Sequence, residues 1–280
     1  MTSKILKIAL IGRTNAGKST LINRIVGEKI SIQNKKINTT QVTIMGVKNI
    51  KKTQLIFYDT PGSNFLKSLN NQSQNLKTNL WSGIDESNII FYLIDSKTAN
   101  KKFLFEQIDK LQEVKKKIII IFNKIDLISN KQLLPLISDL NKSFNIDSFF
   151  TLSAIQNIGI EDLLDYIVKY SYVSEWIFNH DEITDKDDIF IVGELLRETM
   201  LTYLHKEIPY NVNIKTSNFK ILKNNDIKIK QKIIINQKRY KKIILGKKGE
   251  MIKKIREDTQ KKMSQILDSK IHLYLEILNA

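Results

Sequence analysis

The chain has 280 residues, a net charge of +16 and no cysteine, which excludes a disulfide framework, a thiolate metal cluster and a cysteine nucleophile. With 42% hydrophobic residues it can bury a packed core, which excludes a disordered chain. Its longest apolar runs, at 89–94 and 118–122, are far shorter than the roughly 18 residues that span a bilayer.

Residues 1–172 alternate short apolar runs with amphipathic stretches. The predicted strands are 5–11, 42–47, 55–58, 89–94, 118–122 and 149–152. Apolar residues at spacings of three and four predict helices at 19–26, 103–114, 133–144 and 160–170. Near-continuous apolar strands interleaved with helices are typical of an α/β domain, in which helices cover both faces of a mainly parallel sheet.

The charge changes sign along the chain. Residues 1–172 carry a net charge of +10, residues 173–200 a net charge of −6 and residues 201–280 a net charge of +12. We therefore predict a first domain at 1–172, an acidic linker at 173–188 and a second domain at 189–280. So basic a segment is typical of a polyanion binder, and a well-solvated lysine-rich surface is the alternative.

The second domain has a different order of predicted elements, and it is smaller than the first. The sequence predicts a helix at 189–204, strands at 211–215 and 227–235, helices at 239–245 and 250–267, and a last strand at 271–277. This order predicts an α+β domain.

The first functional motif follows the first predicted strand. Residues 12–19 read GRTNAGKS and fit the P-loop pattern between a strand and a helix. Glycines let backbone N–H groups turn toward phosphates, and the helix N-terminus adds its dipole. Lys18 is predicted to reach the β- and γ-phosphates, and Ser19 to bind Mg²⁺. The predicted nucleotide-binding residues of this loop are Gly12, Asn15, Ala16, Gly17, Lys18, Ser19 and Thr20.

Residues 59–62 read DTPG and follow the strand 55–58, so Asp59 is predicted to hold Mg²⁺ through water. The Gly62 N–H is predicted to sense the γ-phosphate. Thr39 and Thr40 offer hydroxyls as a second Mg²⁺ ligand, and we favour Thr40, although both also suit the entry to a strand. The predicted catalytic residues are Lys18, Thr40 and Gly62, and the predicted metal ligands are Ser19, Thr40 and Asp59.

Residues 123–126 read NKID and follow the strand 118–122. A carboxylate can accept hydrogen bonds from both N1–H and the 2-amino group of guanine, so Asp126 predicts GTP rather than ATP. Asn123 is predicted to join neighbouring loops near the base, and the stem of Lys124 to cover the ring. Ser153 and Ala154 follow the strand 149–152, and the Ala154 N–H is predicted to face guanine O6.

Residues 246–249 read GKKG and precede the helix 250–267. Such a turn brings backbone N–H groups close to a nucleic-acid backbone; a simple helix-capping turn is the alternative. Ile243, Ile244 and Ile252 are expected to line a groove for unpaired bases. The predicted RNA-binding residues are Lys241, Lys242, Gly246, Lys247, Lys248, Gly249 and Lys253.

In this order the motifs resemble those of the Era GTPases, in the TrmE–Era–septin class of P-loop GTPases. Residues 12–20 resemble the family's G-R-x-N-x-G-K-S-T, and residues 31–40 resemble its switch segment. Residues 193–198 and 207–210 resemble its entry into a KH domain. The resemblance implies a Ras-like GTPase domain followed by a smaller type II KH domain.

The resemblance implies a GTP-hydrolysing switch that uses GTP, GDP and Mg²⁺, with K⁺ bound at Asn15. It further implies binding of the 3′ end of small-subunit (16S-type) ribosomal RNA during 30S assembly. Intrinsic hydrolysis should be slow, because no glutamine stands where Ras-like enzymes position water. We expect a cytoplasmic bacterial monomer. Family members are in some cases peripheral to the cell membrane, so its inner face is a second expected location.

Two alternatives are considered. One is another tRNA- or ribosome-associated GTPase, which a second GTPase domain or a modification domain would support. The other is a nucleotide-independent RNA-binding protein with a vestigial GTPase domain. The intact Lys18, Ser19, Asp59 and Asp126 argue against the second alternative.

Overall fold

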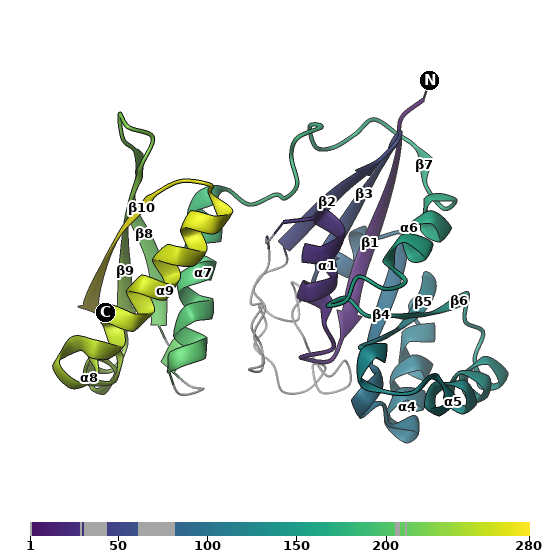
Figure 1. Cartoon of the computed structure of the whole chain (residues 1–280). Helices are drawn as coiled ribbons and strands as arrows, with labels where there is room; N and C mark the ends of the chain where they lie inside the picture. Colours follow the sequence, from purple (N-terminus) through teal and green to yellow (C-terminus); the bar gives the residue numbers. More distant parts are fainter. Residues whose placement is uncertain (1, 29, 31–43, 61–81, 205–207, 211) are drawn as a thin grey trace. The chain divides into compact units, whose positions relative to one another are not determined.

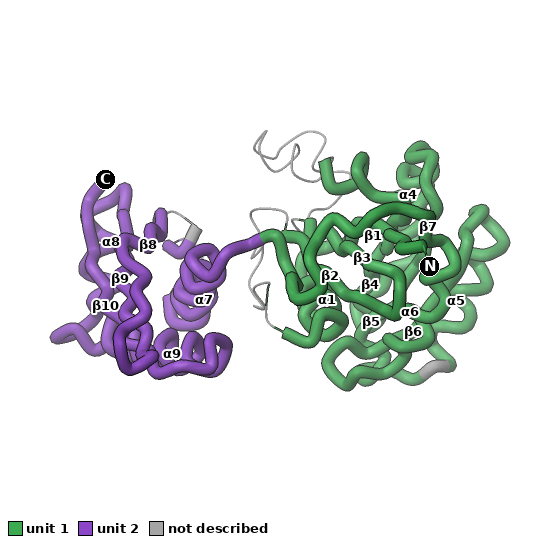
Figure 2. Tube along the Cα trace, turned by 90° about the horizontal axis from the view of Figure 1, so that it is seen from above, with its two compact units in different colours: residues 1–31, 37–185 green, residues 32–36, 186–280 purple. Residues whose placement is uncertain are grey.

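The structure is a computed structural model that describes residues 2–28, 30, 44–60, 82–204, 208–210 and 212–280. The described residues form two compact units (Figure 2), the first ending at Asp185 and the second beginning at Lys186. Figure 1 labels the helices and strands of each unit.

The first unit is built on a seven-stranded sheet. Its strands are β1 (Lys4–Gly12), β2 (Ile44–Ile50), β3 (Thr53–Asp59), β4 (Ile89–Asp95), β5 (Lys117–Asn123), β6 (Ser148–Leu152) and β7 (Tyr172–Val173). The order is β2-β3-β1-β4-β5-β6, and the short β7 pairs with the start of β1. β2 and β7 are antiparallel to their neighbours and the other strands are parallel, which confirms the predicted mainly parallel sheet.

Helices cover both faces of this sheet. They are α1 (Lys18–Val26), α4 (Lys101–Gln112), α5 (Asn130–Ser143) and α6 (Ile160–Val168). Apolar residues of α4 and α5 form one core with alternate residues of the central strands, such as Tyr92, Ile120 and Phe122. The strand neighbours that point the other way, such as Phe91 and Ile121, are equally buried. α1 packs on β1, β2 and β3 (Figure 1). Burial on both faces explains the near-continuous apolar strands.

The segment 180–185, which we call the edge segment, lies along the outer edge of β2. The Val47 N–H donates to the Ile183 carbonyl (2.8 Å), and the Met45 N–H donates to Asp185 Oδ1 (2.8 Å). This segment lies within the predicted acidic linker, residues 173–188. In the structure it belongs to the first unit, because an exposed strand edge leaves backbone groups that need partners.

The second unit carries a three-stranded sheet and three helices. Its elements are α7 (Asp188–Tyr203), β8 (Val212–Ile221), β9 (Ile227–Ile235), α8 (Lys238–Leu245), α9 (Glu250–Ile266) and β10 (Ile271–Asn279). The strand order is β10-β9-β8, with β9 parallel to β10 and antiparallel to β8. This order of elements confirms the predicted α+β domain. β8 is longer than predicted, because its polar second half still pairs with β9.

The second unit packs its helices on one face of the sheet. Ile233, Ile244 and Ile255 are fully buried in the core that α7, α8 and α9 form with the strands. Ile244 was predicted to line a groove for RNA bases, and this prediction is wrong because its side chain is a core residue of α8. No helix in the described ranges is long and apolar enough to cross a membrane.

Candidate nucleotide and RNA sites

The loop between β1 and α1 places two glycines where no other residue fits. A Cβ on Gly12 would lie 2.4 Å from the carbonyl oxygen of Leu93. A Cβ on Gly17 would lie 2.1 Å from Asn123 Nδ2, and Gly17 has a φ of 100°, which favours glycine. The loop is therefore packed directly against the ends of β4 and β5, at the edge of the sheet where α/β proteins bind ligands.

Lys18 lies buried at the first turn of α1, with 6% of its surface exposed. Its Nζ donates to the carbonyl oxygens of Gly12 (3.0 Å) and Arg13 (3.3 Å), so the ammonium group is held by the loop itself. Burial lowers the pKa of Lys18, and the Asp59 carboxylate opposes this. An anionic phosphate would oppose it in the same way, because an opposite charge favours the ammonium form.

Ser19 and Asp59, two of the predicted metal ligands, lie in contact in the structure. The Ser19 hydroxyl donates to Asp59 Oδ2 (2.8 Å), and Asp59 is buried at the end of β3. Hydroxyl and carboxylate oxygens are the hard ligands that Mg²⁺ prefers, so these residues fit the ion. Within the described ranges no three His, Asp or Glu side chains cluster. Thr39, Thr40 and Gly62 lie outside the described residues.

Asn123, at the end of β5, connects three parts of the site. Its Nδ2 donates to the carbonyl oxygen of Ala16 in the P-loop (2.9 Å). Its Oδ1 accepts from the Ala154 N–H (3.1 Å) and the Lys124 N–H (2.8 Å). The Ala154 N–H was predicted to face guanine O6, so contact with the base requires this N–H to be shared with Asn123. One buried amide thus sets the distance between the phosphate loop and the base-binding loops.

Asp126, the predicted guanine reader, is exposed and held by one neighbour. The buried Ser153 donates its hydroxyl to Asp126 Oδ1 (2.5 Å). The contribution of Arg24 on α1 was not predicted from the sequence. Arg24 donates to the carbonyl oxygens of Ala154 (3.2 Å) and Ile155 (2.9 Å). These two hydrogen bonds hold the loop that follows β6 against α1. No sequence signal marks Arg24, because a basic residue is ordinary in the last turn of a helix.

Lys124 pairs with Asp95, a contact that was not predicted from the sequence. Its Nζ forms an ion pair with Asp95 Oδ2 (2.6 Å) and donates to the Asn15 carbonyl oxygen (2.5 Å). Asp95 ends β4 directly opposite Asn123 in the sheet register. Lys124 has a φ of 65°, an uncommon conformation for a residue with a side chain, which costs about 1–3 kcal/mol. Asp95 could have been predicted as a site residue, because it is a carboxylate at the end of a buried central strand.

We predict that Asp95→Asn speeds GDP release. A charged hydrogen bond contributes about 1.5–3 kcal/mol, which corresponds to roughly a ten-fold change or more. The measurement is stopped-flow displacement of a fluorescent GDP, with turnover at saturating GTP expected to stay unchanged. Asp139→Asn is the matched control, because Asp139 pairs with Lys101 on the exposed surface. Equal release rates in wild type and Asp95→Asn would show that the ion pair does not position Lys124.

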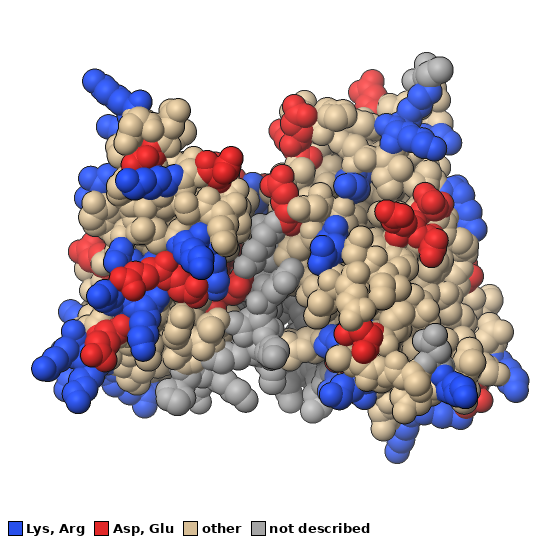
Figure 3. Space-filling model, viewed as in Figure 1, with Lys and Arg blue, Asp and Glu red and all other residues tan. Residues whose placement is uncertain are grey.

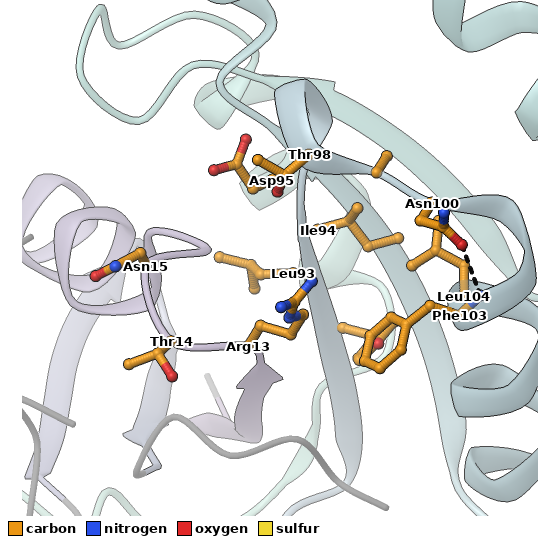
Figure 4. Close-up of a pocket in the computed structure, with 12 residues that line it drawn as sticks. Arg13, Thr14, Asn15, Leu93, Ile94, Asp95, Thr98, Asn100, Phe103 and Leu104 are labelled. Atoms are coloured by element: carbon orange, nitrogen blue, oxygen red, sulfur yellow. Dashed lines mark hydrogen bonds between the residues drawn. The ribbon is translucent and has the colours of Figure 1, made fainter. Parts of the chain in front are cut away.

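A pocket of about 290 Å³ lies between the P-loop and the start of α4 (Figure 4). Arg13 and Thr14 of the P-loop line one side, and Asn100 and Phe103 line the other. The Arg13 guanidinium lies over the Phe103 ring, 4.9 Å from its centre, a cation–π contact. This contact links the P-loop to α4 on the side away from β2.

Both glycines of the G-x-x-G loop in the second unit have positive φ angles, which favour glycine. Gly246 has a φ of 71°, and a Cβ there would lie 2.5 Å from Met251 Cβ. Gly249 has a φ of 81° and caps the start of α9. The predicted basic residues are all exposed: Lys241, Lys242, Lys247, Lys248 and Lys253. Figure 3 shows basic side chains gathered at the end of this unit where α8 lies. Ile243 is 40% exposed and can contact a base.

Arg197 connects the two sequence motifs at the start of the second unit, because it contacts both Glu194 and Pro209. Its Nη1 donates to the Pro209 carbonyl oxygen (2.8 Å), and its Nε pairs with Glu194 (3.2 Å). Burial raises the pKa of Glu194, and Arg197 opposes this. The segment 193–198 is therefore joined to Pro209 through one nearly buried guanidinium group.

Together, the folds and loops define a P-loop GTPase that carries a KH domain. Residues 7–124 match the family model described as 50S ribosome-binding GTPase, and residues 207–279 match the KH domain model. GTPase Era of Agrobacterium fabrum is 36% identical over 96% of this chain and 84% of its own length. GTPase Era of Rickettsia conorii is 35% identical over 97% of this chain and 79% of its own length. The chain belongs to the Era family of GTPases.

Solved structures agree with this assignment. Era in complex with MgGDPNP and nucleotides 1506–1542 of 16S ribosomal RNA superposes with a TM-score of 0.88 at 29% identity, over 99% of this chain and 94% of the other. An Aquifex aeolicus Era variant bound to GDP·AlF₄⁻ gives a TM-score of 0.87 at 28% identity, over 100% and 94%. The similarity spans both units, so the chain shares the two-domain fold of Era.

Proposed function

We propose that this Era-family GTPase acts as a GTP-driven switch that binds the 3′ end of small-subunit ribosomal RNA and assists 30S assembly. The main support for nucleotide binding is the pair of hydrogen bonds that the Asn123 amide forms with the P-loop and with the loop of Ala154. The G-x-x-G loop with its exposed lysines supports the RNA half. The related Era structure with nucleotides 1506–1542 of 16S ribosomal RNA supports the choice of RNA.

In the proposed mechanism, Lys18 contacts the β- and γ-phosphates and stabilises the charge that develops on them during transfer. Ser19 and Asp59 would hold Mg²⁺ together with Thr40, and the Gly62 N–H would donate to the γ-phosphate. When bound, Mg²⁺ would supply positive charge that offsets the charge of the phosphates. Asp126 binds the guanine edge, with its orientation fixed by the Ser153 hydroxyl.

The edge segment supports a route from the nucleotide to the second unit. β2 directly follows residues 31–43, which contain Thr40, and the edge segment is hydrogen-bonded to β2 and leads into α7. A change in the position of Thr40 on hydrolysis would therefore reach the start of the RNA-binding unit. Such coupling is reciprocal, so bound RNA should change GTP affinity relative to GDP affinity. Equal affinities for both nucleotides with and without RNA would contradict it.

We also propose that K⁺ binds beside the phosphates at Asn15. Asn15 lies in the P-loop with a φ of 67°, and its carbonyl oxygen is held by Lys124. Replacing K⁺ by Na⁺ at equal ionic strength is expected to slow GTP turnover, because the smaller ion prefers shorter ligand distances. Phosphate release in the two salts is the measurement. Identical turnover in both salts would contradict K⁺ dependence.

The RNA partner is proposed to be single-stranded at the G-x-x-G loop, because a KH groove clamps about four nucleotides of one strand. The protein is proposed to work as a monomer in the cytoplasm, with the inner face of the cell membrane as a second location. Cell fractionation and light scattering test these two points. Recovery of the protein as a stable dimer would contradict the monomer.

Binding of a labelled single-stranded RNA from the 3′ end of small-subunit ribosomal RNA tests the proposed function. The wild-type protein is expected to bind this RNA and to bind GTP in preference to ATP. A protein with a vestigial GTPase domain would bind the RNA and no nucleotide. A GTPase that acts elsewhere would bind GTP and show no preference for this RNA.

A further inference from the structure

The pocket between the P-loop and α4 has a buried floor and an exposed rim (Figure 4). Tyr92 and Leu104 belong to its floor, with 2% and 3% of their surfaces exposed. Arg13 and Asn100 belong to its rim and are exposed, so a ligand can enter from solvent. The volume of about 290 Å³ lies at the lower end of the range for ligand sites, which fits a small molecule with a single ring.

Two hydrogen-bond donors of this pocket have no partner among the residues that the structure describes. The Tyr92 hydroxyl forms no hydrogen bond there, although its side chain is buried. Burial raises the pKa of Tyr92 and the Arg13 charge opposes this, so the phenol keeps its proton at neutral pH and can donate. The Arg13 guanidinium has neither an ion pair nor a hydrogen bond and lies over the Phe103 ring. A buried hydroxyl without a partner is uncommon and points to a missing acceptor.

The other groups around the pocket define the shape of that acceptor. A guanidinium that stacks on a ring keeps N–H groups at its edge, and these match the two oxygens of a planar carboxylate. Asn100 Oδ1 accepts from the Phe103 N–H (3.1 Å), which leaves the amide nitrogen of Asn100 as a further donor. Leu104 and the other apolar residues of the pocket suit a hydrocarbon body.

We propose that this pocket binds a small carboxylic acid with an apolar body, whose carboxylate lies between the Arg13 guanidinium and the Tyr92 hydroxyl. Binding of the acid goes beyond the proposed function, whereas its effect on the nucleotide rests on that function. A carboxylate is favoured over a phosphate dianion, because Asp95 lines the same pocket and repels a second negative charge more strongly. The Asp95 charge is itself offset by Lys124 (2.6 Å).

The pocket shares two contacts with the proposed nucleotide site. The Arg13 carbonyl oxygen accepts from Lys18 Nζ (3.3 Å), and Asp95 pairs with Lys124, which is predicted to cover guanine. An acid in the pocket and phosphates at the P-loop are like charges on one loop, so they repel. Because GTP carries one more negative charge than GDP, the acid is expected to weaken GTP binding more than GDP binding. The effect is reciprocal, so GTP should weaken binding of the acid by the same factor.

The test uses the full-length protein loaded with GDP and three probes that share one fluorinated ring. The acid is para-fluorophenylacetate, its uncharged counterpart is para-fluorophenylacetamide, and the more highly charged counterpart is para-fluorobenzylphosphonate. Fluorine NMR titration gives the affinity of each probe. The variants are Tyr92→Phe, which removes only the hydroxyl, and Arg13→Gln, which removes the charge.

Each variant has a matched control outside the pocket. Tyr58→Phe removes the hydroxyl of another buried tyrosine, which donates to Glu86 (3.1 Å). Arg239→Gln removes an exposed arginine of the second unit that also lies over an aromatic ring. Both controls should bind the acid as wild type does.

We expect wild type to bind the acid about ten-fold more tightly than the amide, or better, because a hydrogen bond to a charged group is lost in the amide. Tyr92→Phe and Arg13→Gln should each weaken the acid about ten-fold. The melting temperature of Tyr92→Phe without probe should stay equal or rise, since an unpaired hydroxyl is removed, whereas Tyr58→Phe should melt earlier. Replacing GDP by a non-hydrolysable GTP analogue should weaken the acid by about two-fold or more.

Different results would overturn different parts of this proposal. No binding of the acid, equal binding of acid and amide, or full affinity in Tyr92→Phe would overturn the carboxylate site and leave the proposed function standing. Tighter binding of the phosphonate than of the acid would overturn the choice of a carboxylate. Equal affinity for the acid in the two nucleotide states would overturn the coupling. Wild-type protein that binds the acid and no GDP would overturn the proposed nucleotide site and leave the pocket standing.

Discussion

Asp126→Asn is expected to shift nucleotide preference from GTP to XTP by about 10³-fold or more. The carboxylate accepts from two N–H groups of guanine, whereas an amide offers one acceptor and one donor. A site built to form such hydrogen bonds rejects the wrong partner strongly, because buried polar groups are left unpaired. Xanthine carries an oxygen in place of the 2-amino group and therefore accepts from the new amide.

The measurement is competition of GTP and XTP for the nucleotide site, followed by single-turnover hydrolysis of each. Ser153 can still donate to the asparagine oxygen, so the side chain should keep its orientation. Asp181→Asn makes the same chemical change on a fully exposed side chain and should leave the preference unchanged. A variant at position 126 that keeps the wild-type preference would exclude Asp126 as the guanine reader.

Reversing the charge at Lys247→Asp and Lys248→Asp is expected to lower RNA affinity by about 100-fold or more. Two charged contacts to phosphate contribute about 1.5–3 kcal/mol each, and 1.4 kcal/mol is a factor of ten. Both side chains are exposed, so the fold should tolerate the change. Lys248 has a φ of 50°, a conformation that aspartate adopts more readily than lysine.

The measurement is anisotropy with the labelled single-stranded RNA, together with GTP turnover without RNA. Lys131→Asp with Lys142→Asp is the matched control, because it makes the same charge change in the first unit. Turnover should stay at the wild-type level in both variants, since neither pair touches the nucleotide site. RNA affinity that falls equally in the control would mean that net charge, and not the G-x-x-G loop, binds the RNA.

The nucleotide loops could be predicted because each follows an apolar strand that is readable from the sequence. Asp59, Asn123 and Ser153 all lie at carboxyl ends of parallel strands, and such ends meet at one edge of the sheet. The type of each described α-helix, and of each described strand except the two-residue β7, was equally readable from periodicity. The two glycines of the P-loop also carried a physical signal, since each occupies space that a Cβ would fill.

Other features depend on contacts between distant segments and carry no local pattern. The ion pair of Asp95 with Lys124 requires the register of β4 and β5. The sequence of the edge segment is acidic and shows no periodicity. Its position follows from hydrogen bonds to the edge of β2, which the sequence alone does not indicate. The apolar spacing around Ile244 fits both a core residue and a residue that lines a groove. The structure shows that its side chain is fully buried in the core. The β-bulge between Thr216 and Asn218 shifts the register between β8 and β9. The roles of Thr40 and Gly62 stay predictions.

We propose that this GTPase selects one ribosomal RNA segment through its KH domain. Ultraviolet crosslinking of the protein in cells, followed by sequencing of the bound RNA, tests it most directly. We expect reads concentrated at the 3′ end of the small-subunit ribosomal RNA, and their loss in the Lys247→Asp, Lys248→Asp variant. Reads spread evenly over cellular RNA, or concentrated on transfer RNA or the large-subunit ribosomal RNA, would contradict the account.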